Sequence, residues 1–105
     1  MSLQISGNQD ERILECIDGG LDVFGTTVKN VIYFRFHTIY NHDRKDIIYK
    51  PELFSECLRT FFGERAFHVE AAIVSVILNK FHLANVALSD SLTRAIVEAR
   101  REPRG

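Results

Sequence analysis

Residues 51–81 have the sequence PELFSECLRTFFGERAFHVEAAIVSVILNKF and contain the clearest structural signal in the chain. Apolar side chains in the first part recur at steps of one, three and four, which is the spacing of one helical face. Pro51 suits the first turn of that helix, where its missing N–H has no intrahelical partner to lose. We predict that the helix ends at Gly63, because glycine adopts backbone conformations that other residues avoid. The apolar positions are Leu53, Phe54, Cys57, Leu58, Phe61 and Phe62.

The second part of this stretch, residues 66–82, predicts a helix that is apolar on more than one face. Such a helix is either central in its domain or shared with a partner. A narrow polar row follows the same helix, and it either faces solvent or sets the helix register between two subunits. One apolar stripe contains Val69, Ile73, Val76 and Ile77, a second contains Phe67, Val74, Leu78 and Phe81, and the polar row contains His68, Ser75, Asn79 and His82.

Three more helices are predicted around this pair. Helical spacing predicts one helix over about 9–24. It predicts a second helix that is capped by Thr26 or Thr27 and runs to about Tyr40. A last helix follows Ser89 as its cap and ends before Pro103. The glycines at 19–20 imply close backbone packing or a break in the first helix. The predicted core contains Ile17, Ile32, Phe54, Leu58, Phe61, Ile73 and Ile77.

The chain of 105 residues is the size of one domain. We predict an all-α fold, a compact bundle of about five helices at 9–101, with tails at 1–8 and 102–105. The hydrophobic content of 46% excludes general disorder, and the net charge of −1 disfavours a globally basic nucleic-acid binder. No apolar run reaches the roughly 18 residues of a membrane span. The charges at Asp43, Arg44, Lys45 and Asp46 are interpreted as a solvated connection.

The two cysteines, Cys16 and Cys57, are predicted to be unpaired. Small secreted domains carry many more cysteines, and each of these two lies in an apolar stretch typical of buried thiols. A reducing, cytoplasmic location follows as an expectation.

Sequence motifs give no support for an enzyme, a cofactor or a metal site. His37 and His42 are five residues apart, whereas a spacing of four would place two ligands together on one helical face. His68 and His82 are fourteen apart, about 21 Å along a helix, so they cannot share a metal within one chain. The chain has neither a Cys-x-x-Cys pair nor a glycine-rich phosphate loop.

The pattern resembles the Nitrosopumilus output domain, a small all-helical archaeal family, or a closely related archaeal family. The resemblance rests on the helix ending Phe24-Gly25, the Pro51-Glu52-Leu53-Phe54 start and the hinge at 61–66, and it covers about 11–81. It implies an archaeal domain that occurs alone or attached to signalling and regulatory modules. It brings no catalytic residues.

The function expected from these observations is that of a non-catalytic interaction or regulatory output module that forms a homodimer. Apolar positions beyond the needs of one buried stripe indicate a self-complementary patch. These surplus positions are Tyr33, Phe34, Phe67, Val74 and Leu78, and the candidate interface is Phe67, His68, Val74, Ser75, Leu78 and Asn79. The alternative is a small nucleic-acid-binding domain that uses Arg94, Arg100, Arg101 and Arg104.

Overall fold

Helices account for all regular structure in residues 4–83, 85–87 and 90–101, which the computed structural model describes. This confirms the predicted all-α class. The radius of gyration is 13.1 Å, close to the ~13 Å of a compact domain with this many residues. The helices are α1 (Gln4–Asp22), α2 (Thr26–Tyr40), α3 (Pro51–Phe62), α4 (Ala66–Phe81) and α5 (Leu92–Arg101), with short 3-10 segments η1 (Arg44–Ile48) and η2 (Gly63–Arg65).

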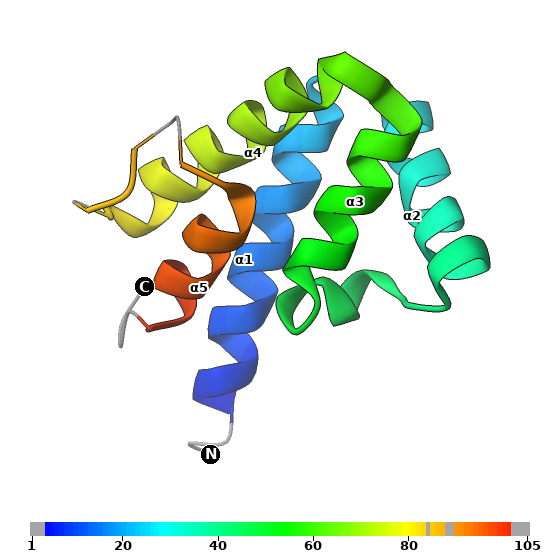
Figure 1. Cartoon of the computed structure of the whole chain (residues 1–105). Helices are drawn as coiled ribbons and strands as arrows, with labels where there is room; N and C mark the ends of the chain where they lie inside the picture. Colours follow the sequence, from blue (N-terminus) through cyan, green and yellow to red (C-terminus); the bar gives the residue numbers. More distant parts are fainter. Residues whose placement is uncertain (1–3, 84, 88–89, 102–105) are drawn as a thin grey trace.

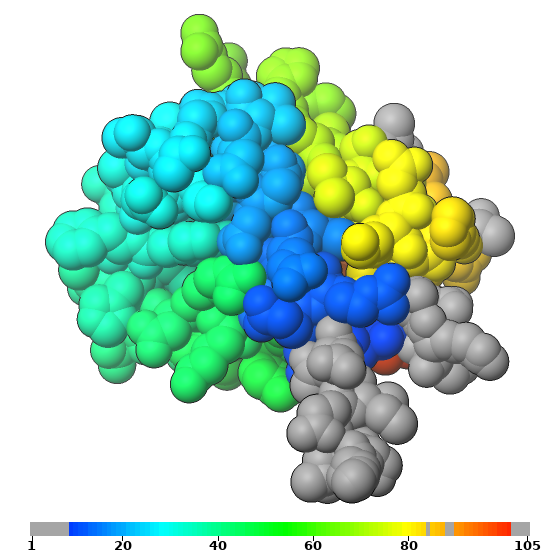
Figure 2. Space-filling model, turned by 180° about the vertical axis from the view of Figure 1, so that it is seen from behind, coloured from blue at the N-terminus to red at the C-terminus, as the bar shows by residue number. Residues whose placement is uncertain are grey.

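Helix α1 runs through the middle of the molecule (Figure 1). Helix α4 crosses α1, with α2 and α3 on one side and α5 on the other. Seen from behind, α1 forms a stripe between α2 and the end of α4 (Figure 2). The core between these helices is aliphatic and aromatic, and its largest fully buried side chains are Phe36, Phe54, Ile13, Ile17, Leu21, Ile32, Ile47, Leu58, Ile73, Ile77, Leu92 and Ile96.

The crossing of α1 and α4 depends on a glycine. A Cβ atom at Gly20 would lie 2.6 Å from the Cα of Ile73 and 2.7 Å from its Cγ1. At Gly19 the nearest atom, a methyl carbon of Val76, would be 3.9 Å away, which is ordinary contact. Helix α1 continues through both positions. Of the two alternatives left by the sequence, close packing is therefore the correct one, and Gly20 is the residue that requires it.

Helix α3 ends as predicted. Gly63 is its C-terminal cap, with a φ of 64° and a backbone N–H that donates to the carbonyl of Arg59. This φ lies in the region that favours glycine. The chain then makes the single 3-10 turn η2 and enters α4, so that α3 and α4 form a corner at one end of the molecule (Figure 1).

Several boundaries differ from those predicted. Helix α1 begins at Gln4, so part of the predicted tail 1–8 is helical. It ends at Asp22, which leaves Phe24 in a turn instead of on the helical face. Gly25 occupies the N-cap position of α2. At the start of α5, the Oγ of Ser91 accepts the backbone N–H of Arg94, which is a capping geometry. The predicted cap Ser89 and the tail 102–105 lie outside the described residues.

The predicted core is confirmed at every position except Phe61. Ile17, Ile32, Phe54, Leu58, Ile73 and Ile77 are all fully buried, but Phe61 is 38% exposed. The last turn of α3 extends past Leu58, the last buried residue of this helix, into the corner. Helical spacing therefore assigned Phe61 to the correct face of α3, but this residue lies past the end of the core.

The two cysteines are unpaired and buried, as predicted. Burial raises the pKa of both the Cys16 and the Cys57 thiol, so the neutral form is favoured in each. Such a thiol is a poor nucleophile, because the thiolate is the reactive form.

The connection at 43–46 was predicted to carry solvated charges, but one of its charged side chains is hydrogen-bonded to α1. Arg44 forms two hydrogen bonds with Asp18 of α1, from Nε at 3.0 Å and from Nη2 at 2.7 Å. The hydroxyl of Tyr33 donates to the same carboxylate at 2.5 Å. The hydrogen bonds that Arg44 donates to Asp18 raise the pKa of Arg44, and burial raises the pKa of Tyr33. The interpretation of Arg44 as solvated charge is wrong, because this group joins α1, α2 and η1.

Candidate interaction surface

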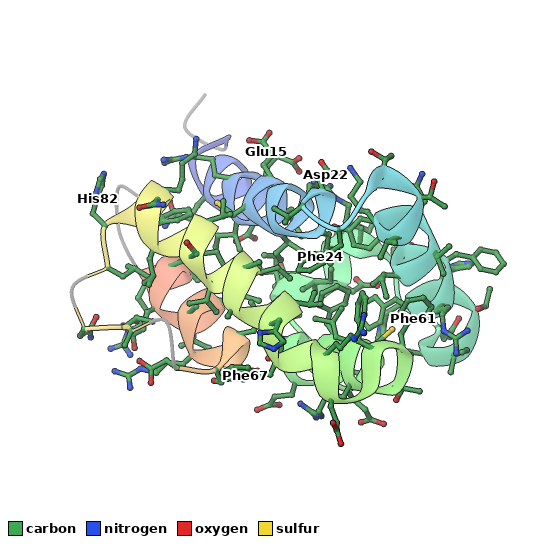
Figure 3. All side chains as sticks on the ribbon, turned by 90° about the horizontal axis from the view of Figure 1, so that it is seen from above. Glu15, Asp22, Phe24, Phe61, Phe67 and His82 are labelled. Carbon is green, nitrogen blue, oxygen red and sulfur yellow. The ribbon has the colours of Figure 1, made fainter. Side chains whose placement is uncertain are left out.

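Aromatic side chains, all exposed except the half-buried Phe62, gather where α3 turns into α4. Phe24 and Phe62 have ring centroids 6.3 Å apart, and Phe61 packs edge-on against Phe62 at 4.9 Å. Phe67, which is 66% exposed, contacts the ring of His68 at 5.6 Å. Figure 3 looks down on this end of the molecule and labels three of these rings. We call the group the corner surface, and it consists of Val23, Phe24, Phe61, Phe62, Glu64, Arg65, Phe67 and His68.

The corner surface contains a hollow of about 380 Å³. Its walls are the apolar side chains of Phe24, Phe62 and Val69, and its polar lining comes from Arg65 and His68. Val23, beside it in the turn after α1, is 71% exposed. Aromatic and arginine side chains around a concave apolar centre are the composition of protein–protein interfaces.

Two opposite charges stand at the tip of the corner. Glu64 and Arg65 are consecutive in η2, and both are exposed. Side chains of this corner project from the end of the molecule (Figure 2). Within the described chain neither Glu64 nor Arg65 has an ion pair or a side-chain hydrogen bond. The apolar corner therefore carries one unpaired charge of each sign.

A second hollow, also about 380 Å³, lies on the α5 side of the corner. Its lining includes Glu64, Phe67, Glu70 and Asp90. Glu70 accepts a hydrogen bond from Ser55 at 3.5 Å, and it faces Arg59 at 3.9 Å. Burial nevertheless raises the pKa of Glu70, since desolvation outweighs these contacts. Glu70 thus joins α4 to α3 beneath the corner.

The predicted interface residues on α4 do not form one surface. Phe67 and His68 are exposed on the corner surface. Val74 is fully buried, so its assignment to an exposed patch is wrong: α4 is central, and Val74 and Phe81 of its second apolar stripe pack inside the chain. Leu78 is half-buried against the core, as is Tyr33 of the predicted surplus positions. Ser75 is half-buried, and Asn79 is exposed beside a separate hollow with Glu15 and Lys80.

The described arginines of the alternative, nucleic-acid hypothesis all face carboxylates. Arg94 lies 3.7 Å from Asp90, and Arg101 lies 3.6 Å from Glu98. Arg100 pairs with Asp10 of α1 at 3.3 Å and lies over the ring of Tyr49. Arg104 lies outside the described residues. Charges already neutralised within the chain contribute less to phosphate binding.

The histidines do not converge. His37 lies 2.9 Å from Asp43 and His42 lies 3.4 Å from Asp46, so each pairs with a different carboxylate beyond the end of α2. His68 and His82 lie near opposite ends of α4. In the described part of the chain, no three His, Cys, Asp or Glu side chains are grouped so that they could hold a metal ion. None of the helices described there combines the length and hydropathy needed to cross a membrane.

Of the corner surface, the predicted interface contained only Phe67 and His68. Val23 and Phe24 were absorbed into the first helix, and Phe61 into the core. The available signal was the end of each helix: Gly25 and Gly63 mark the two places where apolar residues leave the core. Comparison with protein families, curated proteins and solved structures finds no match to this chain. The resemblance to an archaeal output domain therefore stays a prediction.

Proposed function

We propose that the chain is a non-catalytic interaction module that associates with a second copy of itself through the corner surface. The observation that carries this proposal is the contiguous aromatic cluster at the α3–α4 corner, from Phe61 through Phe62 and Phe24 to the hollow beside His68. Monomeric proteins seldom expose large apolar patches to water, and such patches mark interaction sites.

The distribution of exposed apolar residues supports this choice of surface. Phe34 and Ile39 on α2 and Val97 on α5 are also exposed, at 66%, 57% and 43%. In the described part of the chain, the ring contacts of the corner involve none of these three residues, and none of them lines its hollow. Exposed apolar residues that stand alone are normal on a protein surface. The corner differs because several rings contact one another around a hollow.

The experiment compares self-association of the wild type with that of two single variants by sedimentation velocity. Protein concentrations run from 5 to 200 µM, a range that brackets a dissociation constant of ~10 µM. Phe61→Glu places a charge in the corner surface, and Ile39→Glu places the same charge at an exposed position near the end of α2. We expect a concentration-dependent dimer for the wild type and Ile39→Glu, and a monomer for Phe61→Glu. A wild type that stays at 12.0 kDa throughout would overturn the proposal.

Nucleic-acid binding through the C-terminal arginines is the competing prediction, and salt distinguishes the two. Binding led by phosphate contacts weakens steeply with salt, whereas association by apolar burial does not. The proposal therefore expects the wild-type dimer to persist at 0.5 M NaCl, about threefold above physiological ionic strength.

A further inference from the structure

We propose that the second copy docks across a two-fold axis beside η2, so that Glu64 of each subunit pairs with Arg65 of the other. This inference rests on the proposed function, and it names the register of that contact. It starts from the two charges at the tip of the corner, which have no partner within the described chain.

Symmetry gives these adjacent charges a special property. In a two-fold contact, if residue i of one subunit touches residue j of the other, then j of the first also touches i of the second. A lone arginine near the axis would meet another arginine. Neighbouring opposite charges, by contrast, form two equivalent attractive pairs. Glu64 and Arg65 are consecutive, exposed and of opposite sign, so this part of the surface is complementary to itself.

The surroundings of the two residues put them between the two hollows of the corner. Arg65 lines the apolar hollow that Phe24 and Phe62 share with His68. Glu64 lines the hollow on the other side, together with Phe67. An axis between Glu64 and Arg65 would therefore bring exposed rings from both sides of the corner into the contact. Charge pairs at the edge of buried rings fix the register of an interface and exclude other orientations.

A partner of different chemistry would need only one of the two charges. An acidic protein would bind through Arg65 and His68, and it would be repelled by Glu64. A basic protein would be repelled by Arg65. A second copy is the occupant that uses both charges at once, and charge complementarity therefore selects it.

Charge reversal tests the register. Arg65→Glu and Glu64→Arg each give every subunit two like charges at the tip, so each variant alone should dimerise at least about tenfold more weakly than the wild type. An equimolar mixture of the two variants restores attraction at both contacts. The double variant E64R/R65E restores it within one chain. Matched controls are Lys50→Glu and Glu52→Arg, which make the same charge changes at exposed positions at the opposite end of α3.

Sedimentation velocity of all seven samples at low salt, with circular dichroism as a check of folding, gives the result. The proposal expects weak association for each single reversal, recovery in the mixture and in E64R/R65E, and no change for the controls. If the wild type dimerises but the single reversals match it, or if the mixture does not recover, the two-fold register is wrong while the proposed function stands. If the wild type does not dimerise at all, both are wrong.

Discussion

The α1–α4 crossing and the α3–α4 corner use apolar residues in opposite ways. At the crossing Gly20 lies against the backbone of Ile73, and Ile17, Leu21 and Ile73 are fully buried. At the corner Phe61 and Phe67 are 38% and 66% exposed. A helix that continues straight buries one face along its length, whereas a helix that ends at a turn carries its last apolar residues beyond the core. The difference separates residues that stabilise the monomer from residues available to a partner.

The largest contrast is expected between two phenylalanines of α3. Phe54 is fully buried against Phe36, with ring centroids 5.2 Å apart, so Phe54→Ala should destabilise the fold by about 3–5 kcal/mol. Phe61→Ala should cost less than about 1 kcal/mol in the monomer, because its ring is partly in solvent and packs at the corner. Urea unfolding at a concentration where the protein is monomeric measures both. Equal losses of unfolding free energy for the two variants would contradict the distinction between core and corner.

The next contrast lies within the crossing itself. Gly20→Ala would force its new methyl group against the Ile73 backbone, and we expect a loss of about 1–3 kcal/mol. Gly19→Ala meets only ordinary contact, so it should be neutral or stabilise the helix by up to about 1 kcal/mol. Thermal unfolding of the two variants gives the signs directly. A stable Gly20→Ala variant would mean that the helices cross with more space than the structure has.

Charged residues should show a similar contrast. A paired charge should contribute more to the stability of the monomer than the unpaired charge at the corner. Asp18 and Arg44 form two hydrogen bonds on the α1 side, and a double-mutant cycle with Asp18→Asn and Arg44→Gln should give a coupling of about 1 kcal/mol. Arg65→Gln removes a charge with no partner in the described chain, so its effect on monomer stability should stay within about 0.5 kcal/mol. Chemical denaturation measures the four stabilities of the cycle and that of Arg65→Gln. A coupling near zero would make Arg44 the solvated residue that the sequence predicted.

The smallest effect concerns Glu70 beneath the corner. Because burial raises its pKa, the folded chain binds more protons than the unfolded chain above the ordinary value of 4.5, and stability falls as pH rises through that window. Glu70→Gln keeps the hydrogen-bond acceptor and removes the charge. It should stabilise the protein by a few tenths of a kcal/mol at pH 7 and by less at pH 4. The reverse pH trend would show that the contacts of Glu70 outweigh its desolvation.

The sequence predicted the interior well and the surface poorly, for a physical reason. Helical periodicity identified Phe54, Leu58 and Ile73, because core residues repeat with the helix. It also placed the stop at Gly63, which follows from the backbone freedom of glycine. The same periodicity does not indicate where the core ends, so it led to the wrong predictions that Phe61 is buried and that Val74 is exposed.

Contacts between distant segments have no periodic signal either. The Asp18–Arg44 pair joins residues 26 positions apart, and nothing in the local pattern of either segment indicates the other. The corner surface is similarly assembled from three separate helix ends. Its members become recognisable as a group only when the helices are placed in space.

Amide chemical shifts followed by NMR while the protein is diluted from 1 mM down to the expected dissociation constant of ~10 µM test the central claim most directly. If the corner is the self-association surface, shifts should change for residues at 23–24 and 61–68. Those around Gly20 and Ile73 at the crossing should stay fixed. Shifts that do not depend on concentration, or that change on the outer faces of α2 or α5 while the corner stays fixed, would contradict the account.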